Sequence, residues 1–445
     1  MPLTSYFAEH AWLGGDTTSA DVLIEVHDGT IASVRSGVPR PPAATRLHGV
    51  TLAGLANAHS HAFHRALRGR TQRGGGSFWT WRNEMYAVAD RLTPDTSYAL
   101  ARATYAEMAL SGITCVGEFH YLHHRPGGAP YTDANAMGTA TVAAAADAGI
   151  RLTLLDVCYL AGGVGQPLVG PQLRFGDGDA QAWAVRVDGI KPTCGMRVGA
   201  AIHSVRAVPA AQLSPVVQWA RAKQAPVHVH VSEQRAENEA SLAAYGCSPT
   251  RLLHDHDVLG PRSTAVHATH LGASDIALLG HSGTTICLCP TTERDLADGI
   301  GPARALAAAG SPLSLGSDSN AAVDLWEEAR GVEMHERLRS GARGHWSAAA
   351  LLRAATVDGH VSLGWPEAGR LAIGAPADFV TVDTDSVRMA GADPSTLLES
   401  VVFAATAADV REVVVAGRRV VSEGRHVMVE DVPAALSSAI AAVVS

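Results

Sequence analysis

Eight short apolar runs separated by helix-like segments constrain the fold of this chain more than any other feature. The runs lie at residues 51–58, 113–119, 151–157, 197–202, 226–231, 264–267, 284–289 and 312–316. Most intervals are Ala-rich helical patterns: the interval at 93–111 opens with Thr93-Pro94, and Gly149 ends the one at 133–148. Strands that alternate with helices predict an α/β protein with a parallel sheet. Eight such strands favour a (β/α)8 TIM-type barrel over an open doubly wound sheet.

The two ends of the chain have a different pattern. Near the N-terminus, β-branched runs at 22–26 and 30–34 flank Asp28-Gly29, a hairpin turn signal. Near the C-terminus, runs at 378–382, 413–415 and 420–421 accompany a second turn at Ala416-Gly417. Both ends are therefore predicted to be β-ribbon.

Composition excludes several classes of protein. Lys and Arg number 35 against 43 Asp and Glu, so the formal charge is −8 and a basic excess of the nucleic-acid-binding kind is absent. No run reaches the roughly eighteen apolar residues of a membrane span, and the first fifteen residues contain no signal-peptide core. Six cysteines are too few for a secreted disulfide scaffold. We expect a cytoplasmic protein without nucleic-acid or membrane partners.

Polar side chains gather at the C-terminal ends of the predicted strands, which is where a barrel carries its active site. The chain has 21 histidines, but their clustering at these ends is the informative feature. The strand-end residues are His59-Ser60-His61, Glu118-Phe119-His120-Tyr121, His203, His228-Val229-His230 with Glu233, His267, and Asp318.

The histidine pair after the first strand is a candidate metal site. His59 and His61 are two residues apart on extended chain, so both rings project from one face; alone, they could equally be core histidines. His230 and Asp318 would complete a set of three imidazoles and a carboxylate, which suits a catalytic zinc or another borderline divalent ion. We prefer His230 to its neighbour His228 because Glu233 follows it by three residues.

These motifs resemble the amidohydrolase superfamily, and the resemblance covers essentially the whole chain. It implies that residues 1–50 and 369–445 form a small β-domain built from both chain ends, around a barrel formed by 51–368. It also implies a metal-activated water that attacks an electrophilic carbon. The matching positions are His59-x-His61, His230-x-x-Glu233, His267, Ser317-Asp318, Gly369-Arg370-Leu371 and Gly374-Ala375-Pro376-Ala377-Asp378.

The positions of the two lysines distinguish between branches of this superfamily. Binuclear members generally bridge two metals with a carboxylated lysine at the end of strand four. Lys191 precedes that strand and Lys223 lies in the helix after it, so neither can serve. We therefore expect one divalent ion per chain, Zn²⁺, as in the deaminase branch.

Longer sequence motifs resemble those of the formimidoylglutamate deiminase family of histidine degradation. That family hydrolyses N-formimidoyl-L-glutamate to N-formyl-L-glutamate and ammonia. The resemblance implies catalytic roles for Glu233, His267 and Asp318. One departure is His64, which stands where the family commonly has glutamine near the substrate. The matching words are His59-Ser60-His61-Ala62-Phe63, Ser77-Phe78-Trp79-Thr80-Trp81-Arg82, Glu118-Phe119-His120-Tyr121, Cys289-Pro290-Thr291-Thr292-Glu293 and Ser317-Asp318-Ser319.

Two arginines give separate support to a dianionic substrate. Guanidinium suits bidentate carboxylate binding, and Arg82 and Arg206 follow strands one and four. The resemblance assigns both to carboxylate binding, with Tyr121 and His203 lining the site beside His64. Either arginine could instead be a solvated surface charge. The aromatic stretch 78–81 is expected to be a loop that covers the site.

Two other functions remain possible at this point. A deaminase of a purine, pyrimidine or adenosine-type ring would use the same chemistry, but its pocket would need stacking groups and carboxamides in place of two arginines. A non-catalytic barrel scaffold should have lost ligands or the proton shuttle, and all six key positions are present here. For the assembly, we expect a homodimer.

Overall fold

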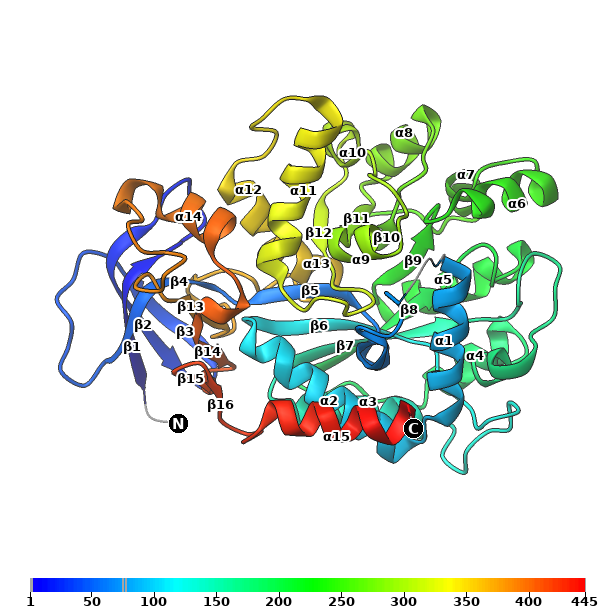
Figure 1. Ribbon diagram of the computed structural model, residues 1–445, viewed down its shortest axis with the longest axis horizontal. Coiled ribbons are helices and arrows are strands. Elements are labelled where there is room, and N and C mark those ends of the chain that lie inside the picture. The colour runs from blue at the N-terminus through cyan, green and yellow to red at the C-terminus, as the bar shows by residue number, and fades with distance from the viewer. Residues whose placement is uncertain (1–2, 74–75, 77, 445) are drawn as a thin grey trace.

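The computed structural model describes residues 3–73, 76 and 78–444 and contains two eight-stranded sheets (Figure 1). In the first sheet every strand pairs in parallel with its neighbours, in the order of the chain. This arrangement confirms the predicted barrel. Its strands are β5 (Leu55–Ser60), β6 (Ile113–His120), β7 (Arg151–Cys158), β8 (Met196–Ile202), β9 (Val227–Val231), β10 (Ser263–His267), β11 (Thr285–Leu288) and β12 (Leu313–Leu315).

The barrel closes where the chain just after β12 meets β5. The Asp318 amide donates to the His59 carbonyl at 2.9 Å, and the His61 amide donates to the Asp318 carbonyl at 3.0 Å. Gly316 makes this approach possible, because a Cβ there would lie 2.8 Å from the His59 carbonyl oxygen. The seam of the barrel is thus formed by residues predicted to be functional.

The second sheet combines both ends of the chain. Its order is β16-β15-β14-β13-β4-β1-β2-β3, and β4 joins the ends by pairing in parallel with β1 and antiparallel with β13. Both predicted hairpin turns occur, with positive φ at Asp28 and Gly29 and at Ala416 and Gly417. The strands are β1 (Thr4–Ala11), β2 (Ser19–His27), β3 (Thr30–Arg35), β4 (Thr45–Ala53), β13 (Phe379–Val382), β14 (Val410–Val415), β15 (Arg418–Ser422) and β16 (Arg425–His426).

The run predicted as one strand at 51–58 is in fact two strands. Residues 51–53 end β4, and β5 begins at Leu55 in the other sheet. Gly54 lies between them, where a Cβ would come within 2.3 Å of the Thr114 side chain, so only glycine allows this close passage. A continuous apolar run cannot reveal such a change of sheet, because both strands are buried. The domain boundaries at 50/51 and 368/369 stay predictions.

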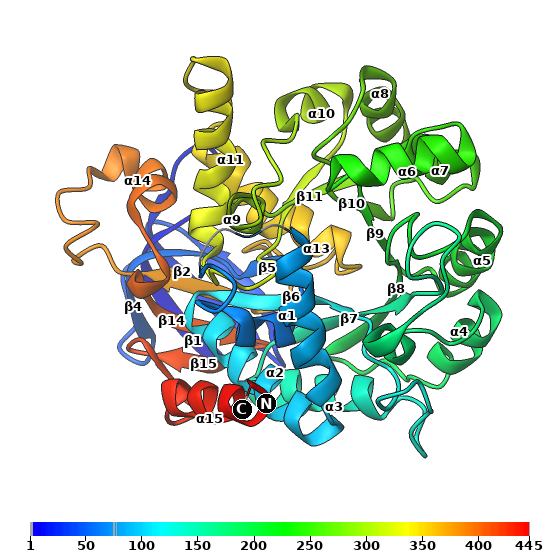
Figure 2. The ribbon, with the colours of Figure 1, turned by 45° about the vertical axis from the view of Figure 1, so that its right-hand side comes forward.

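Helices surround the barrel and lie outside its strands (Figure 2). Thr93 caps α2 as predicted, because its hydroxyl accepts the Thr96 amide. The α-helices are α1 (Phe78–Arg91), α2 (Pro94–Leu110), α3 (Ala136–Ala148), α4 (Ala180–Val187), α5 (Leu213–Lys223), α6 (Arg235–Tyr245), α7 (Pro249–Asp255), α8 (Ala273–Ser282), α9 (Pro290–Asp295), α10 (Ala303–Ala309), α11 (Leu325–Ser340), α12 (Ala348–Arg353), α13 (Gly359–Ser362), α14 (Leu397–Ala404) and α15 (Val432–Val444). Shorter helical turns are η1 (Ala62–Leu67), η2 (Gly170–Arg174), η3 (Ala210–Gln212), η4 (Ala354–Asp358), η5 (Pro394–Thr396) and η6 (Ala407–Asp409).

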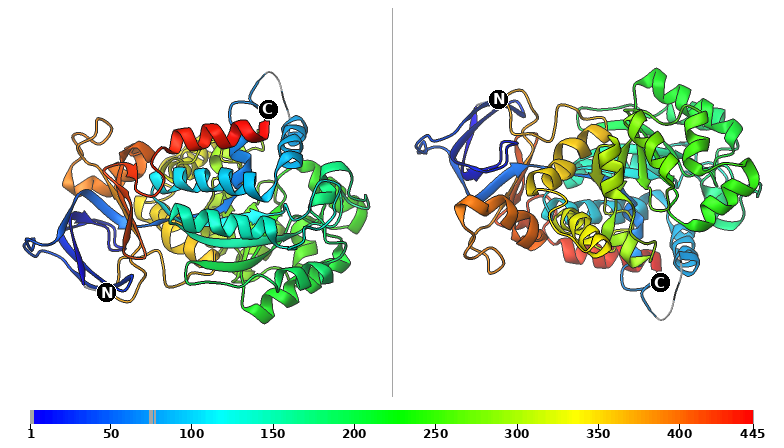
Figure 3. Two further views of the ribbon diagram at one scale, coloured as in Figure 1. Left: turned by 90° about the horizontal axis from the view of Figure 1, so that it is seen from below. Right: turned by 90° about the horizontal axis from the view of Figure 1, so that it is seen from above.

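The last helix lies along the barrel. Val432 and Leu436 of α15 pack with Ala103 and Ala106 of α2 (Figure 3). The β-ribbon predicted for residues 369–445 does not include this helix. No helix in the described part of the chain combines the length and the apolar character needed to cross a bilayer.

Candidate active site

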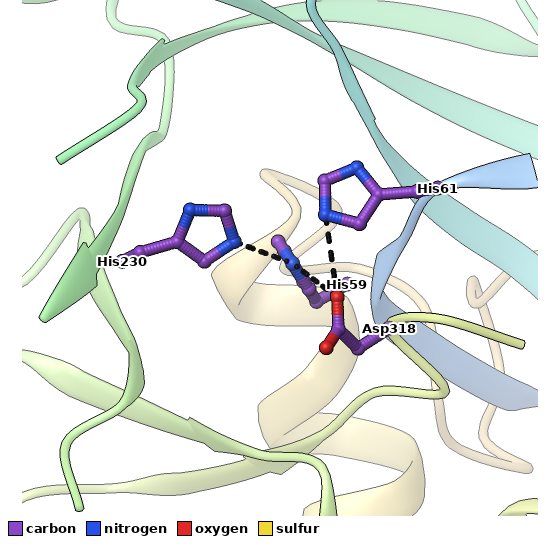
Figure 4. Close-up of side chains that lie close together, drawn as sticks. All are labelled: His59, His61, His230 and Asp318. Carbon is purple, nitrogen blue, oxygen red and sulfur yellow. Dashed lines mark hydrogen bonds and ion pairs between the residues drawn. The ribbon is translucent and has the colours of Figure 1, made fainter. Parts of the chain in front are cut away.

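Four side chains predicted as metal ligands meet at the seam of the barrel (Figure 4). His59 and His61 come from the end of β5, His230 from β9, and Asp318 from the segment after β12. One donor atom of each lies within 4.8 Å of the others, and all four residues are buried. Nε2 of His59 and of His61 lies 3.2 Å from Oδ1 of Asp318, and Nε2 of His59 and of His230 are 3.0 Å apart. Imidazole nitrogens that converge on one another and on a carboxylate oxygen form a donor set for a cation.

In His61 and His230, the Nδ1 atom points away from the centre of the group, and its contact fixes the orientation of the ring. Nδ1 of His61 lies 3.1 Å from the Phe119 carbonyl oxygen, and Nδ1 of His230 lies 2.9 Å from the His203 carbonyl oxygen. A hydrogen on Nδ1 donated to these carbonyls leaves the Nε2 lone pair at the centre. Burial lowers the pKa of His59 to about 3 and that of His230 well below its ordinary value. Both rings are therefore neutral at neutral pH, as metal ligands must be.

The carboxylate of the group is ionised. Burial opposes the charge on Asp318, but His59 and His61 hold its pKa well below the ordinary value. His228, on the same strand as His230, instead lies with Nε2 2.9 Å from the Ser362 carbonyl oxygen. Neutral imidazoles, an ionised carboxylate and full burial fit a divalent metal ion.

Several residues at the strand ends have strained backbones. His267, Asp318, Ser232 and Asn320 have φ of 68°, 41°, 52° and 54°. Such conformations cost about 1–3 kcal/mol each for ordinary residues and cluster at functional sites. The Asn320 side chain donates to the His61 carbonyl at 2.9 Å, which ties one of these turns to a ligand strand. The surrounding barrel holds the chain in the shape that the site requires.

The predicted proton shuttle, Glu233, and the predicted charge-stabilising residue, His267, lie side by side. Oε1 of Glu233 is 3.9 Å from Nε2 of His267, and the same nitrogen is 3.8 Å from Oδ2 of Asp318. Burial raises the pKa of Glu233, with a smaller contribution from Asp318. Burial opposes charge on His267, but Glu233, Glu293 and Asp318 together outweigh it and raise the pKa of that ring well above its ordinary value. A carboxyl group with a raised pKa can both take up and release a proton near neutral pH.

A cavity opens over these groups at the C-terminal ends of the strands. It brings together all five predicted substrate-binding residues and three of the four predicted ligands. Its lining residues are His61, His64, Trp81, Arg82, Met85, Tyr86, Tyr121, Tyr159, Phe175, His203, Arg206, His230, Glu233, His267, Leu296 and Asp318.

Two of the lining residues, His64 and Tyr121, are hydrogen-bonded to each other. Nε2 of His64 lies 2.8 Å from the Tyr121 hydroxyl, and the His64 ring lies 4.4 Å from the ring of His61. Burial lowers the pKa of His64 well below its ordinary value, so the ring is neutral. The residue that departs from the resembled family thus lies between a ligand and a predicted substrate group.

The two arginines reach the cavity from different elements. Nε of Arg206 lies 3.4 Å from Oε2 of Glu237, a buried carboxylate on α6. Arg82 lies on α1, with its guanidinium carbon 5.5 Å from the centre of the Tyr86 ring. The prediction of a loop at 78–81 is wrong, because α1 begins at Phe78. Trp81 lines the cavity, whereas Ser77 and the side chains of Phe78 and Trp79 lie outside the described residues.

Sequence reasoning missed three groups at this site. Tyr159 lines the cavity at the end of β7, and Glu293 lies behind His267 with Oε1 3.5 Å from Nδ1. Asp298 is buried close to Glu233, and burial together with that neighbour raises its pKa to about 8. Only Glu293 stands in a recognisable word of the sequence, Cys289-Pro290-Thr291-Thr292-Glu293; nothing in the local pattern marks the other two.

Comparisons with known proteins agree with this site. The model of the amidohydrolase family matches residues 50–420. The chain is 37% identical over 439 residues to a formimidoylglutamate deiminase of Pseudomonas aeruginosa, which covers 95% of this chain and 96% of the relative. It is 29% identical over 427 residues to a 5-methylthioadenosine/S-adenosylhomocysteine deaminase of Pelotomaculum thermopropionicum, covering 93% of this chain and 92% of the relative.

A solved structure gives the same result. The crystal structure of an amidohydrolase from Brucella melitensis superposes with a TM-score of 0.91 at 36% identity, and the match covers 99% of this chain and 100% of that one. The family match spans most of the chain. The strand-end histidines and the aspartate form one buried group, which the barrel carries. The chain belongs to the amidohydrolase family.

Proposed function

We propose that this chain hydrolyses N-formimidoyl-L-glutamate to N-formyl-L-glutamate and ammonia, the deimination step of histidine degradation, with one zinc ion per chain. The observation that carries the proposal is that two arginines enter the same cavity as a buried His₃Asp group. The 37% identity to a formimidoylglutamate deiminase over nearly the full length supports it. A dianionic amidine has two carboxylates for the two arginines and an electrophilic carbon for the His₃Asp group.

His59, His61, His230 and Asp318 would hold the ion. A divalent ion bound there lowers the pKa of a water from ~15.7 toward ~7. Glu233 then accepts a proton from the water that attacks the formimidoyl carbon, and it returns this proton to the departing nitrogen. The nitrogen leaves as ammonia, and the carbon keeps the oxygen of the water.

His267 assists from the other side of Glu233. Its ring is 1% exposed and has Nε2 directed to Glu233 and Asp318, so it can donate a hydrogen bond to charge that develops on the attacked centre. Burial of this group also excludes bulk water, which strengthens each of these electrostatic interactions. Asp318 can accept a second proton from the attacking water.

The substrate would be fixed by its two carboxylates. Arg82 and Arg206 supply planar guanidinium groups, and a guanidinium held at Nε, as in Arg206, keeps its two terminal nitrogens for bidentate binding. Tyr121 and His203 line the space between the arginines and the His₃Asp group, and His64 takes the position next to Tyr121.

A purine-type deaminase would need a different cavity. Aromatic rings are present, but among the described residues that line the cavity none is Asn or Gln, the side chains that would read a ring's donors and acceptors. A scaffold without catalysis would have no use for a buried donor set beside two proton-transfer groups. We also propose a cytoplasmic location, which fits the six unpaired cysteines, and a homodimer, which analytical ultracentrifugation would test.

Ammonia release from formimidoylglutamate, guanine, cytosine, adenosine and 5-methylthioadenosine tests the proposed substrate. We expect kcat/KM for formimidoylglutamate to exceed the others by at least about 10³-fold, since each lost charged contact costs ~2–5 kcal/mol. Elemental analysis should find one zinc per chain, and chelation should remove zinc and activity together. Faster turnover of any ring substrate would overturn the proposal, and two tightly bound ions would overturn the single-metal assignment.

A further inference from the structure

His267 lies between two sets of carboxylates. Its Nε2 faces Glu233 at 3.9 Å and Asp318 at 3.8 Å, on the side of the cavity. Its Nδ1 faces Oε1 of Glu293 at 3.5 Å on the other side. Glu293 is 5% exposed and does not line the cavity, so it does not reach a bound substrate. Any effect of Glu293 on the reaction must pass through the His267 ring.

The Glu293 carboxylate is held in place by its own helix. The Cys289 amide, at the start of α9, donates to Oε1 of Glu293 at 3.0 Å. The backbone amide of Glu293 donates to the Cys289 carbonyl at 2.9 Å. The carboxylate is therefore a fixed acceptor behind the ring.

Nδ1 of His267 needs such an acceptor. In the described part of the chain this buried nitrogen has no formed hydrogen bond, and 3.5 Å is a few tenths of an ångström longer than one. Leaving a buried donor unpaired costs about 1–3 kcal/mol. Catalytic hydrogen bonds are often long without substrate and shorten in the reacting complex.

The backbone conformation of His267 is a second reason to expect that the ring needs a partner behind it. Both His267 and Ala268 have positive φ, 68° and 51°, at the end of β10. A strand in its ordinary conformation would direct the ring elsewhere, so the ring direction depends on the groups that surround it. Behind the ring, Oε1 of Glu293 lies 3.5 Å from Nδ1.

We infer that Glu293 is a positioning residue: its carboxylate accepts the Nδ1 hydrogen of His267 and thereby directs Nε2 at the reacting group. The inference rests on the proposed function, in which His267 acts on the attacked carbon. In this carboxylate–histidine arrangement, an outer carboxylate fixes the tautomer and the orientation of a functional imidazole.

Two variants of Glu293 separate the loss of the hydrogen-bond acceptor from the loss of the charge. Glu293→Met removes the acceptor at similar length and should lower kcat about 10- to 100-fold, the range for an outer hydrogen-bond partner. KM should change less than about threefold and metal content should not change, because Glu293 touches neither substrate nor ligands. Glu293→Gln keeps an acceptor oxygen and should recover most of the lost kcat. A fall in metal content in parallel with kcat, or a Gln variant as poor as the Met variant, would contradict the positioning role.

Glu328, on α11, provides a matched control that contacts the same helix, α9. It is a buried carboxylate that binds the amide and hydroxyl of Thr291 at the start of α9, and its described contacts do not include His267. Glu328→Gln should leave kcat within about twofold of wild type. If Glu328→Gln lowers kcat as much as Glu293→Met does, the effect is damage to α9, and the inference fails.

A double-mutant cycle gives a further check for variants that fold poorly. In a His267→Asn background the ring is absent, so Glu293→Met should cost less than about twofold in kcat. Equal losses with and without the ring would mean that Glu293 acts on packing alone.

A spectroscopic readout works even if the substrate assignment fails. In zinc-loaded protein with ¹⁵N-labelled histidine, the His267 resonance is the one missing in His267→Asn. We expect a slowly exchanging hydrogen on Nδ1 in wild type and in Glu293→Gln, and its loss in Glu293→Met. The same Nδ1 signal in all three would overturn the inference, whereas an inactive wild type with the predicted signals would overturn only the proposed function.

Discussion

Buried carboxylates of the site differ in what they touch, and this difference assigns their roles at the residue scale. Asp318 lies among the ligand histidines, Glu233 lines the cavity beside His267, and Glu293 lies behind the same ring. The first is suited to hold a cation, the second to move a proton, and the third to orient a ring. All three contact His267, but their other surroundings differ, so their substitution should give three distinguishable results.

Glu233→Gln should keep the metal and lose turnover. The amide has the shape of the carboxyl group but cannot shuttle a proton, so kcat should fall at least ~10²-fold. Glu239→Gln, on the exposed side of α6, is the matched control and should keep the wild-type rate. Elemental analysis accompanies the kinetics. A metal-replete Glu233→Gln variant with near-normal turnover would remove Glu233 from the mechanism.

Arg206→Met should lose substrate recognition selectively. Breaking a charge-assisted pair costs ~2–5 kcal/mol, which corresponds to roughly 30- to 5,000-fold in kcat/KM. An analogue that lacks the carboxylate bound by Arg206 should react poorly with wild type and lose little more in the variant. Because Glu237 loses its partner as well, fold and metal content are checked in parallel. If the loss from Arg206→Met and the loss from removal of either carboxylate are strictly additive, Arg206 does not bind a substrate carboxylate.

At the scale of elements, the strands and the meeting of His59, His61, His230 and Asp318 could be predicted, but the way the barrel closes could not. Alternating apolar runs reveal β5 to β12, and two-residue spacing places His59 and His61 on one face. The division of the run at 51–58 depends on Gly54 passing the Thr114 side chain, and Glu293 meets His267 only because β10 and β11 are neighbours. Such contacts arise from tertiary packing that no local pattern encodes.

Gly316→Ala should open the seam of the barrel. The added methyl group would lie 2.8 Å from both Cβ and the carbonyl oxygen of His59, so the segment after β12 must move away from β5. Overpacking of this kind costs about 1–3 kcal/mol, and it separates Asp318 from the ligand histidines. We expect a lower melting temperature and zinc well below the wild-type content. Gly260→Ala, where a Cβ meets no atom within 4 Å, is the control. Full zinc in Gly316→Ala would contradict this role of the seam.

A buried ionic network joins the segment after β6, which carries Tyr121, to α4. Arg186 binds Asp177 at 2.7 Å and Asp156 at 2.8 Å, and His124 lies 3.2 Å from Asp177. Burial opposes the charge on Asp177, but His124 and Arg186 hold its pKa well below the ordinary value. A lowered carboxyl pKa stabilises the fold above the unfolded-state value near 4 and loses this effect as pH falls through the folded-state value.

The stability difference between wild type and Asp177→Asn should therefore depend on pH. We expect the variant to be less stable by about 1–3 kcal/mol at pH 7 and at pH 5. The gap should narrow at pH 3, because Asp177 then takes up a proton in unfolded wild type but not in the folded state, where its pKa is lower. Urea unfolding at the three pH values measures the gap, with exposed Asp16→Asn as control. A gap that stays constant or widens at pH 3 would contradict the assigned pKa direction.

At the scale of the whole molecule, one sheet joins strands from both ends of the chain and lies beside the barrel (Figure 1). Arg151, the first residue of β7, forms an ion pair with Asp378 next to β13, so the small sheet is fixed to the starts of the barrel strands. The site lies at the opposite, C-terminal ends of those strands. This separation leaves the cavity free to be shaped by the strand-end segments, which is where related proteins can differ in substrate.

The identity of the products tests the central claim most directly. Formimidoylglutamate has two carbon–nitrogen bonds at the formimidoyl carbon, and the account predicts that water replaces the terminal nitrogen only. In H₂¹⁸O, mass spectrometry should find N-formylglutamate with one ¹⁸O in the formyl group, together with one ammonia per substrate consumed. Formation of glutamate and formamide, or no turnover of formimidoylglutamate by protein loaded with zinc, would contradict the account.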